Sequence, residues 1–325
     1  MKSARPLFLL TLLALAAVAA LLLNLSTGSF PLNLVDAFNN TDGAGRKILL
    51  QLRLPRALTA FVTGALLSIA GALMQVLLRN PLADPYILGI SGGASTGALL
   101  AILAGAGSGT LHSSAFVGAL VSTLLVFALA HGHGKWDTTR LLLTGVVLAA
   151  GWGAIISLLL AISPAALVHG MLFWLMGDLG ISTLPWTAGL TLAAGLALAL
   201  YLAPALNLLA AGELKAASLG VAVGRVRIVI YVAASLLTAT AVTLAGNIGF
   251  VGLIAPHILR LLGARDYRSL IPGSALLGGT LLVLADALAR SVIAPRQLPT
   301  GVLTAMLGVP LFLYLLYHAR SRHHE

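Results

Sequence analysis

Residues 212–221 read Gly212-Glu213-Leu214-Lys215-Ala216-Ala217-Ser218-Leu219-Gly220-Val221, and Arg225 and Arg227 follow. This segment lies between two long apolar runs, yet it is too polar for lipid. Glu213 to Leu219 are good helix formers with an acid in the first turn, where the helix dipole favours it. Gly220 supplies the left-handed residue that commonly ends a helix. We expect a short helix, a glycine turn and a second short helical piece, which form either an ordinary loop or a rigid handle for another molecule.

The composition of the chain predicts its class. Of 325 residues, 59% are hydrophobic and 9% are charged, whereas a soluble domain carries about 25% charged residues. The sequence therefore predicts an all-α polytopic membrane protein with a single domain over residues 1–325. A formal charge of +10 would suggest nucleic acid for a soluble chain. Here we attribute it to basic loops on one side, and expect membrane lipid and no nucleic acid as a partner. The absence of Cys excludes disulfides.

Hydropathy predicts about ten membrane spans. The first follows Lys2 and Arg5 and imitates a signal peptide, but it is long enough to span and we expect it to be retained. Gly and Pro interrupt the eighth and tenth, and broken segments persist only where protein or a water-filled cavity covers them. A short apolar piece at 168–175 is expected to dip into the membrane or lie on its outer face. The ten spans are 6–25, 56–78, 87–105, 113–131, 141–162, 184–203, 228–249, 251–263, 270–290 and 300–319.

The basic residues predict the orientation of these spans. With the N-terminus inside, thirteen of the 19 Lys and Arg residues fall on the inner side, and the positive-inside rule favours this arrangement. Both termini and the segment 212–221 are then cytoplasmic. Six basic residues remain outside: Arg46, Lys47, Arg53, Arg56, Arg290 and Arg296.

Small residues four positions apart predict close contacts between helix backbones. The second to fifth and the seventh to tenth spans could also form two inverted halves, as in many transporters. That idea rests on counting spans, because no residue-level repeat is visible. The small pairs are Gly64 and Ser68, Gly93 and Gly97, Ala149 and Gly153, and Ser274 and Gly278.

Four longer motifs carry a resemblance to a known family. Together with residues 212–221, they resemble the membrane subunits of the ABC importers for iron chelates, haem and vitamin B12, the FecCD-type permeases. The resemblance runs from the second span to the C-terminus and leaves the transported chelate open. The motifs are Leu54-Pro55-Arg56, Gly71-Ala72-Leu73-Met74-Gln75 with Arg79-Asn80-Pro81-Leu82-Ala83-Asp84-Pro85, Gly246-Asn247-Ile248-Gly249-Phe250-Val251-Gly252-Leu253-Ile254-Ala255-Pro256-His257-Ile258-Leu259-Arg260, and Leu298-Pro299-Thr300-Gly301 with Gly308-Val309-Pro310.

The resemblance implies the architecture of a type II ABC importer. Two ATPase subunits would lie on the cytoplasmic side, a periplasmic or lipid-anchored substrate-binding protein would dock outside, and the path would lie at the axis of a homodimer in the bacterial inner membrane. In this family the loop between the sixth and seventh spans, here about 207–227, inserts into a groove on the ATPase. Glu213, Ala217, Leu219 and Gly220 match that loop. ATP and Mg²⁺ would bind the partner, so this chain is expected to hold no cofactor and to be no enzyme.

The family also places outward-facing arginines opposite acidic residues of the binding protein, and Arg53, Arg56 and Arg290 match those positions. Arginines at a rim that meet carboxylates would steer docking and fix its register. The alternative for each is an interfacial side chain that reaches the lipid headgroups. For Arg290 a second alternative is an ion pair with Asp286, four residues earlier on the same helix.

Other functions fit the sequence less well. Gly89-Ile90-Ser91-Gly92 matches a short pattern of intramembrane serine proteases, but such matches arise by chance in a chain rich in Gly and Ser. We expect His257 to hydrogen-bond carbonyls freed by Pro256. No Gly-Lys-Ser/Thr motif for ATP is present.

The histidines at 131, 133, 323 and 324 have too few companion ligands, so no metal is expected. A proton-coupled secondary transporter with inverted repeats is the alternative function, and it would use Asp286 or His257.

Overall fold

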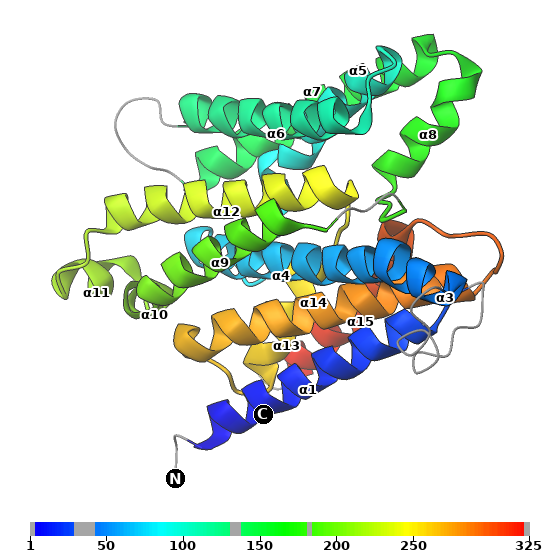
Figure 1. Cartoon of the computed structure of the whole chain (residues 1–325). Helices are drawn as coiled ribbons and strands as arrows, with labels where there is room; N and C mark the ends of the chain where they lie inside the picture. Colours follow the sequence, from blue (N-terminus) through cyan, green and yellow to red (C-terminus); the bar gives the residue numbers. More distant parts are fainter. Residues whose placement is uncertain (1–3, 29–42, 131–137, 181–183, 322–325) are drawn as a thin grey trace.

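The computed structural model describes residues 4–28, 43–130, 138–180 and 184–321, and within these ranges the chain folds into helices without strands (Figure 1). Seven helical runs in the described part are long and apolar enough to cross a membrane. They are α1 (Ala4–Ser26), the continuous run of α3 (Ala44–Lys47), the π-helical turn η1 (Ile48–Arg53) and α4 (Leu54–Leu77), α6 (Ser108–Ala130), α7 (Thr138–Ile162), α9 (Trp186–Tyr201) with α10 (Ala203–Ala210), α12 (Val223–Ala245) and α14 (Tyr267–Ser291).

Shorter helices complete the bundle. With the seven long runs, α5, α13 and α15 account for the ten expected spans, and α8 covers the short apolar piece expected at 168–175. The remaining elements are the 3₁₀ turn η2 (Pro85–Leu88), α5 (Ile90–Leu103), α8 (Ala165–Leu175), α11 (Glu213–Ser218), α13 (Val251–Leu261) and α15 (Thr300–Ser321). The interruption expected in the tenth span is not present, because α15 is one continuous helix of 22 residues with Pro310 inside it.

The third expected span, 87–105, is shorter than its hydropathy indicates. The helix in it, α5, has 14 residues, or about 21 Å, whereas the apolar core of a bilayer is about 30 Å thick. Pro85 cannot donate a backbone hydrogen bond, and Gly89 has a left-handed φ of +68°. Both features stop the helix from extending toward α4. The chain therefore enters this span as an irregular segment followed by a half-length helix.

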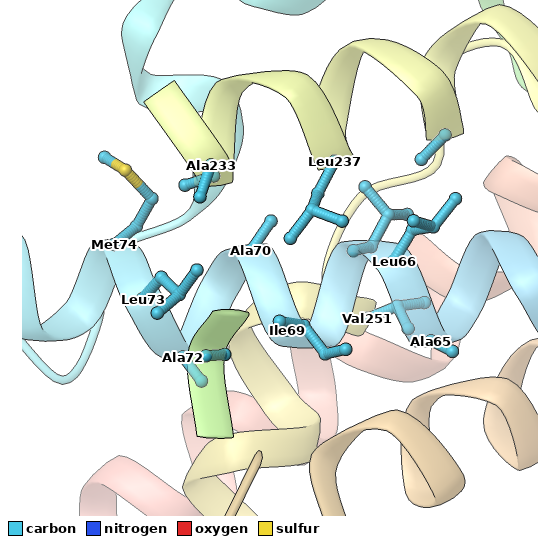
Figure 2. Packing of buried hydrophobic residues seen from close by; sticks show 14 of the residues in the cluster. Ala65, Leu66, Ile69, Ala70, Ala72, Leu73, Met74, Ala233, Leu237 and Val251 are labelled. Carbon is cyan, nitrogen blue, oxygen red and sulfur yellow. The ribbon is translucent and has the colours of Figure 1, made fainter. Parts of the chain in front are cut away.

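The central helix of the bundle is α4. It buries 20 of its 24 residues, and it packs against α12, α13 and α14. Figure 2 shows Leu66 and Ala70 of α4 beneath Leu237 of α12, all of them buried. Small and aliphatic side chains therefore enclose α4 on several sides.

Glycines bring the helix backbones around α4 into contact. A Cβ on Gly64 would overlap the carbonyl of Gly278 in α14, and one on Gly71 would overlap the carbonyl of Gly252 in α13. The predicted small-residue pairs at 64/68, 93/97 and 274/278 therefore lie in helix contacts. A Cβ on Gly153, by contrast, would meet nothing within 4 Å. Gly153, the second residue of the pair 149/153, thus faces away from the rest of this chain.

Irregular backbone also lies deep inside the bundle. Pro85 lies beside Gly252 and the carbonyl of Leu67, and Leu67 is ten residues, about 15 Å, from the end of α4. The Tyr86 hydroxyl accepts a hydrogen bond from the backbone N–H of Ile248 at 3.3 Å. This backbone at membrane depth is covered by protein, as the predicted broken segments require.

The helices meet in two polar clusters at opposite ends of the bundle. At the first, the α11 end, Glu213 pairs with arginines from the end of α4 and the start of α12. At the second, the α3 end, Asp286 of α14 accepts hydrogen bonds from Asn24 of α1 and Arg56 of α4. Helix α1 ends and α15 begins at the α3 end, so the first residue of α1 and the last residue of α15 lie toward the α11 end (Figure 1).

Candidate functional site

The predicted short helix at the α11 end is present. Gly212 precedes it with φ +122°, and Gly220 follows it with φ +83°. The backbone N–H groups of Val221 and Gly220 donate to the carbonyls of Ala216 and Ala217, each at 3.0 Å, which is the double hydrogen bond of a glycine-terminated helix. The expected left-handed stop is therefore confirmed.

The second short helical piece expected after Gly220 is not a separate element. Helix α12 starts at Val223, so Arg225 and Arg227 occupy its first turns. The reason is that Gly220 alone provides the turn, and the residues after it continue without a second break. Helix α11 is thereby joined to a membrane-spanning helix through a few residues only.

The faces of α11 differ in their surroundings. Ala216 is buried against the chain, whereas Ala217 and Leu219 are exposed, Leu219 at 59%. Leu214 is 89% exposed, and one helical turn separates it from Ala217. Leu214 was not among the residues predicted to contact a partner, because its outward position depends on which face of α11 packs on the bundle. Helix α11 therefore presents the apolar Leu214 and Ala217 outward, beside the polar Lys215 and Ser218.

The Glu213 carboxylate turns toward the bundle. It forms ion pairs with Arg79, just beyond the end of α4, and with Arg227 in α12. The Glu213 side chain is 28% exposed, and those of Arg79 and Arg227 are 47% and 12% exposed. Of the four residues predicted to couple the chain to an ATPase, Glu213 thus contacts this chain itself, and the others lie on the exposed surface of the turn.

A second polar tie at the same end joins α10 to α14. The Asn207 side-chain amide donates to the Asp266 carboxylate at 2.8 Å, and the backbone N–H of Tyr267 donates to the Asn207 amide oxygen at 3.0 Å. The hydrogen bond from Asn207, and then that from the Arg268 N–H, hold the pKa of Asp266 below its ordinary value. These bonds fix the helix preceding α11 to the start of α14.

The three predicted docking arginines lie together at the α3 end. Arg56 Nε donates to Asp286 Oδ1 at 2.8 Å, and Arg290 Nε donates to Asp286 Oδ2 at 3.1 Å. Arg53 donates to the backbone carbonyls of Leu25 and Ser26 at 2.7 and 3.1 Å. Each arginine is only 6–7% exposed. The alternative prediction for Arg290, an ion pair with Asp286, is therefore confirmed.

Polar residues that the sequence analysis did not select complete this cluster. The Arg290 guanidinium donates to the side-chain oxygen of Asn24 at 2.7 Å, and that of Arg56 donates to Gln297 at 2.7 Å. Asn24 also donates to Asp286 at 3.1 Å. Asn24 lies more than 250 residues from its partners in α14. No local pattern connects such distant positions, so the sequence alone gave no signal for them.

Among the described residues, no hydrogen bond joins Ser91 to His257, the two residues of the protease alternative. Ser91 lies at the start of α5, and His257 packs edge-on against Phe312 at 6.0 Å. Within the described ranges His257 Nε2 has no hydrogen-bond partner, so the expected hydrogen bonds to freed carbonyls do not involve that atom.

No group of metal-ligating side chains occurs in the part of the chain that the structure describes. The histidines at 131, 133, 323 and 324 lie outside that part.

Comparison with known proteins places this architecture in a family. Residues 14–318 match the model of the FecCD transport family. The chain is 39% identical over 314 residues to proteins named vitamin B12 import system permease protein BtuC from Shigella boydii serotype 18 and Escherichia coli O9:H4, a match that covers 95% of this chain and 94% of each relative.

Solved structures agree with the sequence comparison. A metal-chelate type ABC transporter in an inward-facing conformation has a TM-score of 0.84 and 32% identity, and the match covers 96% of this chain and 99% of the other. PsaBC from Streptococcus pneumoniae, in complex with Fab, has a TM-score of 0.58 at 18% identity and shares the fold. The chain therefore belongs to the FecCD transport family and is a multi-pass inner-membrane permease of the metal-chelate and vitamin B12 type of ABC importers.

Proposed function

We propose that this permease imports a metal chelate into the cytoplasm and is driven by two copies of a separate ATPase subunit that act on α11. The observation that carries the proposal is the build of α11. It is a short helix with Leu214 exposed on its outer side, while glycines bound it at both ends. The exposed Leu214, with the exposed Ala217 one helical turn away, is suited to a hydrophobic groove on a partner.

The α11 end is assigned to the cytoplasm. Thirteen of the 19 Lys and Arg residues fall on this side when the chain is threaded through ten spans. Both ends of the chain lie on the same side in this assignment. The ATPase would then meet α11, and the α3 end would face the periplasm.

Transport would proceed by rocking of the bundle. Closure of the ATPase subunits on ATP would move the two α11 helices of a homodimer, and each would shift the start of α12 and the end of α4. The half-length helices α5 and α13 start inside the bundle, where a relative movement of α4 and α12 changes the exposed surface. Exposed apolar side chains on α7 and α15, such as Val147 and Met306, are suited to cover by lipid or by the second subunit along the path.

The α3 end would receive the substrate-binding protein, whether periplasmic or lipid-anchored. Arg53, Arg56 and Arg290 supply three positive charges around one carboxylate, Asp286. Acidic residues on the binding protein would complement this excess positive charge. A small rearrangement of the covering residues would be needed, because each arginine is nearly buried.

The substrate class follows from the relatives. The similar proteins are named for vitamin B12 import and for metal-chelate transport, so a corrinoid, haem or ferric siderophore is the proposed class. An apolar path lined by small residues is suited to a bulky chelate that passes without tight binding.

Co-purification tests this proposal. The permease should form a complex with an ATPase whose hydrolysis rises when the loaded binding protein is added, and replacement of Ala217 by Arg should abolish this response. Uptake without an ATPase that is lost on replacing Asp286 or His257 would instead support a proton-coupled carrier. That alternative is weakened because both oxygens of Asp286 already accept hydrogen bonds from arginines.

A further inference from the structure

Arg79 has an unusual backbone conformation at the end of α4. Its φ is +48°, one of two positive values among the described non-glycine residues. The N–H groups of Arg79 and Asn80 donate to the carbonyls of Val76 and Gln75 at 3.2 and 3.1 Å, so Arg79 occupies the helix-ending position that glycine usually takes. An arginine in this left-handed conformation destabilises the fold relative to a glycine. The backbone conformation therefore does not explain why an arginine occupies this position.

The Arg79 side chain supplies that reason. Its guanidinium pairs with Glu213, the first residue of α11, and Arg227 of α12 pairs with the same carboxylate. Otherwise α11 packs mainly against its chain neighbours α10 and α12. The pair between Arg79 and Glu213 therefore joins α11 to the end of α4, the central helix, which buries 20 of its 24 residues.

The two glycines that flank α11 have open surroundings. A Cβ on Gly212 or on Gly220 would meet nothing within 4 Å, so α11 is held to the bundle mainly by buried Ala216 and by the ion pairs of Glu213. Partly exposed ion pairs add little to stability, and two of these side chains are more than a quarter exposed. The ion pairs of Glu213 are therefore better suited to transmit a movement of α11 to its neighbours than to stabilise the fold.

We propose that the Arg79–Glu213–Arg227 cluster is the mechanical link through which a movement of α11 reaches α4 and α12 together. This inference rests on the proposed function and goes beyond it by assigning the positioning residues. Glu213 acts through the two arginines and not by touching the ATPase. Without the cluster, the ATPase would still bind the permease and hydrolyse ATP, but less substrate would be transported for each ATP hydrolysed.

The test is the substitution Arg79→Gly in the complete complex of permease, ATPase and binding protein in proteoliposomes. Glycine suits the left-handed position, so the thermal unfolding midpoint should stay the same or rise. The amount of substrate transported per ATP hydrolysed should fall several-fold, while ATPase co-purification remains at the wild-type level. A loss of structure would lower the unfolding midpoint. It therefore cannot explain a variant that keeps or raises this midpoint and transports less substrate per ATP.

Matched variants sharpen the test. Arg265→Ala removes an exposed arginine from the turn between α13 and α14, outside the loop at 207–227, and should leave the amount of substrate transported per ATP unchanged. Arg79→Lys keeps the positive charge and should lower that amount less than Arg79→Gly does. Glu213→Gln should reproduce the loss, and adding Arg79→Gly to it should lower that amount no further.

Three results would overturn the proposed role of the cluster. They are a wild-type amount of substrate transported per ATP in Arg79→Gly, additive losses of this amount in the double variant, and loss of ATPase binding in Arg79→Gly. A wild-type complex without any ATP-dependent transport would contradict the proposed function itself.

Discussion

The turn at Gly220 was predictable from the local sequence. Its left-handed φ of +83° was predictable because a glycine after a run of helix formers commonly ends a helix. The outward position of Leu214 was not predictable in the same way, since it depends on which face of α11 packs on the bundle. The ion pairs of Glu213 likewise depend on Arg79, which is distant in sequence.

Replacement of Gly220 by Ala tests the glycine-terminated turn. A Cβ in this conformation costs about 1 kcal/mol, so we expect a lower thermal unfolding midpoint and weaker substrate-stimulated ATP hydrolysis. Gly224→Ala is the control, because Gly224 lies inside helix α12 and a Cβ there meets nothing within 4 Å. Equal midpoints for the two variants would contradict the assigned conformation.

Asp286 presents the opposite case, since its environment was only partly visible in the sequence. The spacing of four predicted its pair with Arg290, but the contacts with Arg56 and Asn24 arise from tertiary packing. The near burial of all three arginines was therefore not predictable, because Asn24 and Gln297 reach them from other elements.

Replacement of Asp286 by Ala should strongly destabilise the α3 end. It leaves the buried guanidinium groups of Arg56 and Arg290 without their carboxylate, a change that typically costs about 3–5 kcal/mol. Thermal unfolding in detergent measures the effect. Asp178→Ala is the comparison, because the Asp178 carboxylate accepts a local hydrogen bond from Gly180 within its own turn. An Asp286→Ala protein that unfolds like the wild type would show that the cluster is not formed.

The elements around α4 were correctly predicted to be helices, but the length of one of them, α5, was overestimated. Continuous hydropathy over 87–105 concealed the break at Pro85 and Gly89, because a hydropathy average does not detect where the backbone leaves the helix. Small-residue spacing did indicate the contacts of α4 with α14, but Gly71 against Gly252 was found only in the structure. The arrangement of two long helices followed by half-length helices, α4 with α5 and α12 with α13, fits the inverted halves, which remain a prediction.

Replacement of Gly71 by Ala tests the crossing of α4 and α13. The added methyl group would overlap the carbonyl of Gly252, and overpacking of this kind costs about 1–3 kcal/mol. We expect a lower unfolding midpoint and a displaced α13. Gly189→Ala in α9 adds a methyl group that meets nothing within 4 Å, so that variant should be as stable as the wild type or more stable. The reverse order of stability would refute the contact.

The whole molecule has two polar ends joined by an apolar bundle. One end carries the short helix α11, and at the other end Arg56 and Arg290 pair with Asp286. Composition was sufficient to predict a polytopic membrane protein, because a chain with 9% charged residues cannot form a soluble surface; the role of permease came from the family resemblance. The transported chelate could not be predicted, since exposed apolar side chains such as Val147 of α7 and Met306 of α15 do not distinguish one chelate from another.

Uptake into proteoliposomes tests the central claim, that a partner's ATP cycle drives this permease through α11. The permease, its ATPase and its loaded binding protein are reconstituted together, and substrate accumulation is followed with ATP supplied on the α11 side. The account predicts uptake that requires this ATP and that stops when Ala217→Arg keeps α11 out of the ATPase. Accumulation by the permease alone under a proton gradient, unchanged by Ala217→Arg, would contradict it.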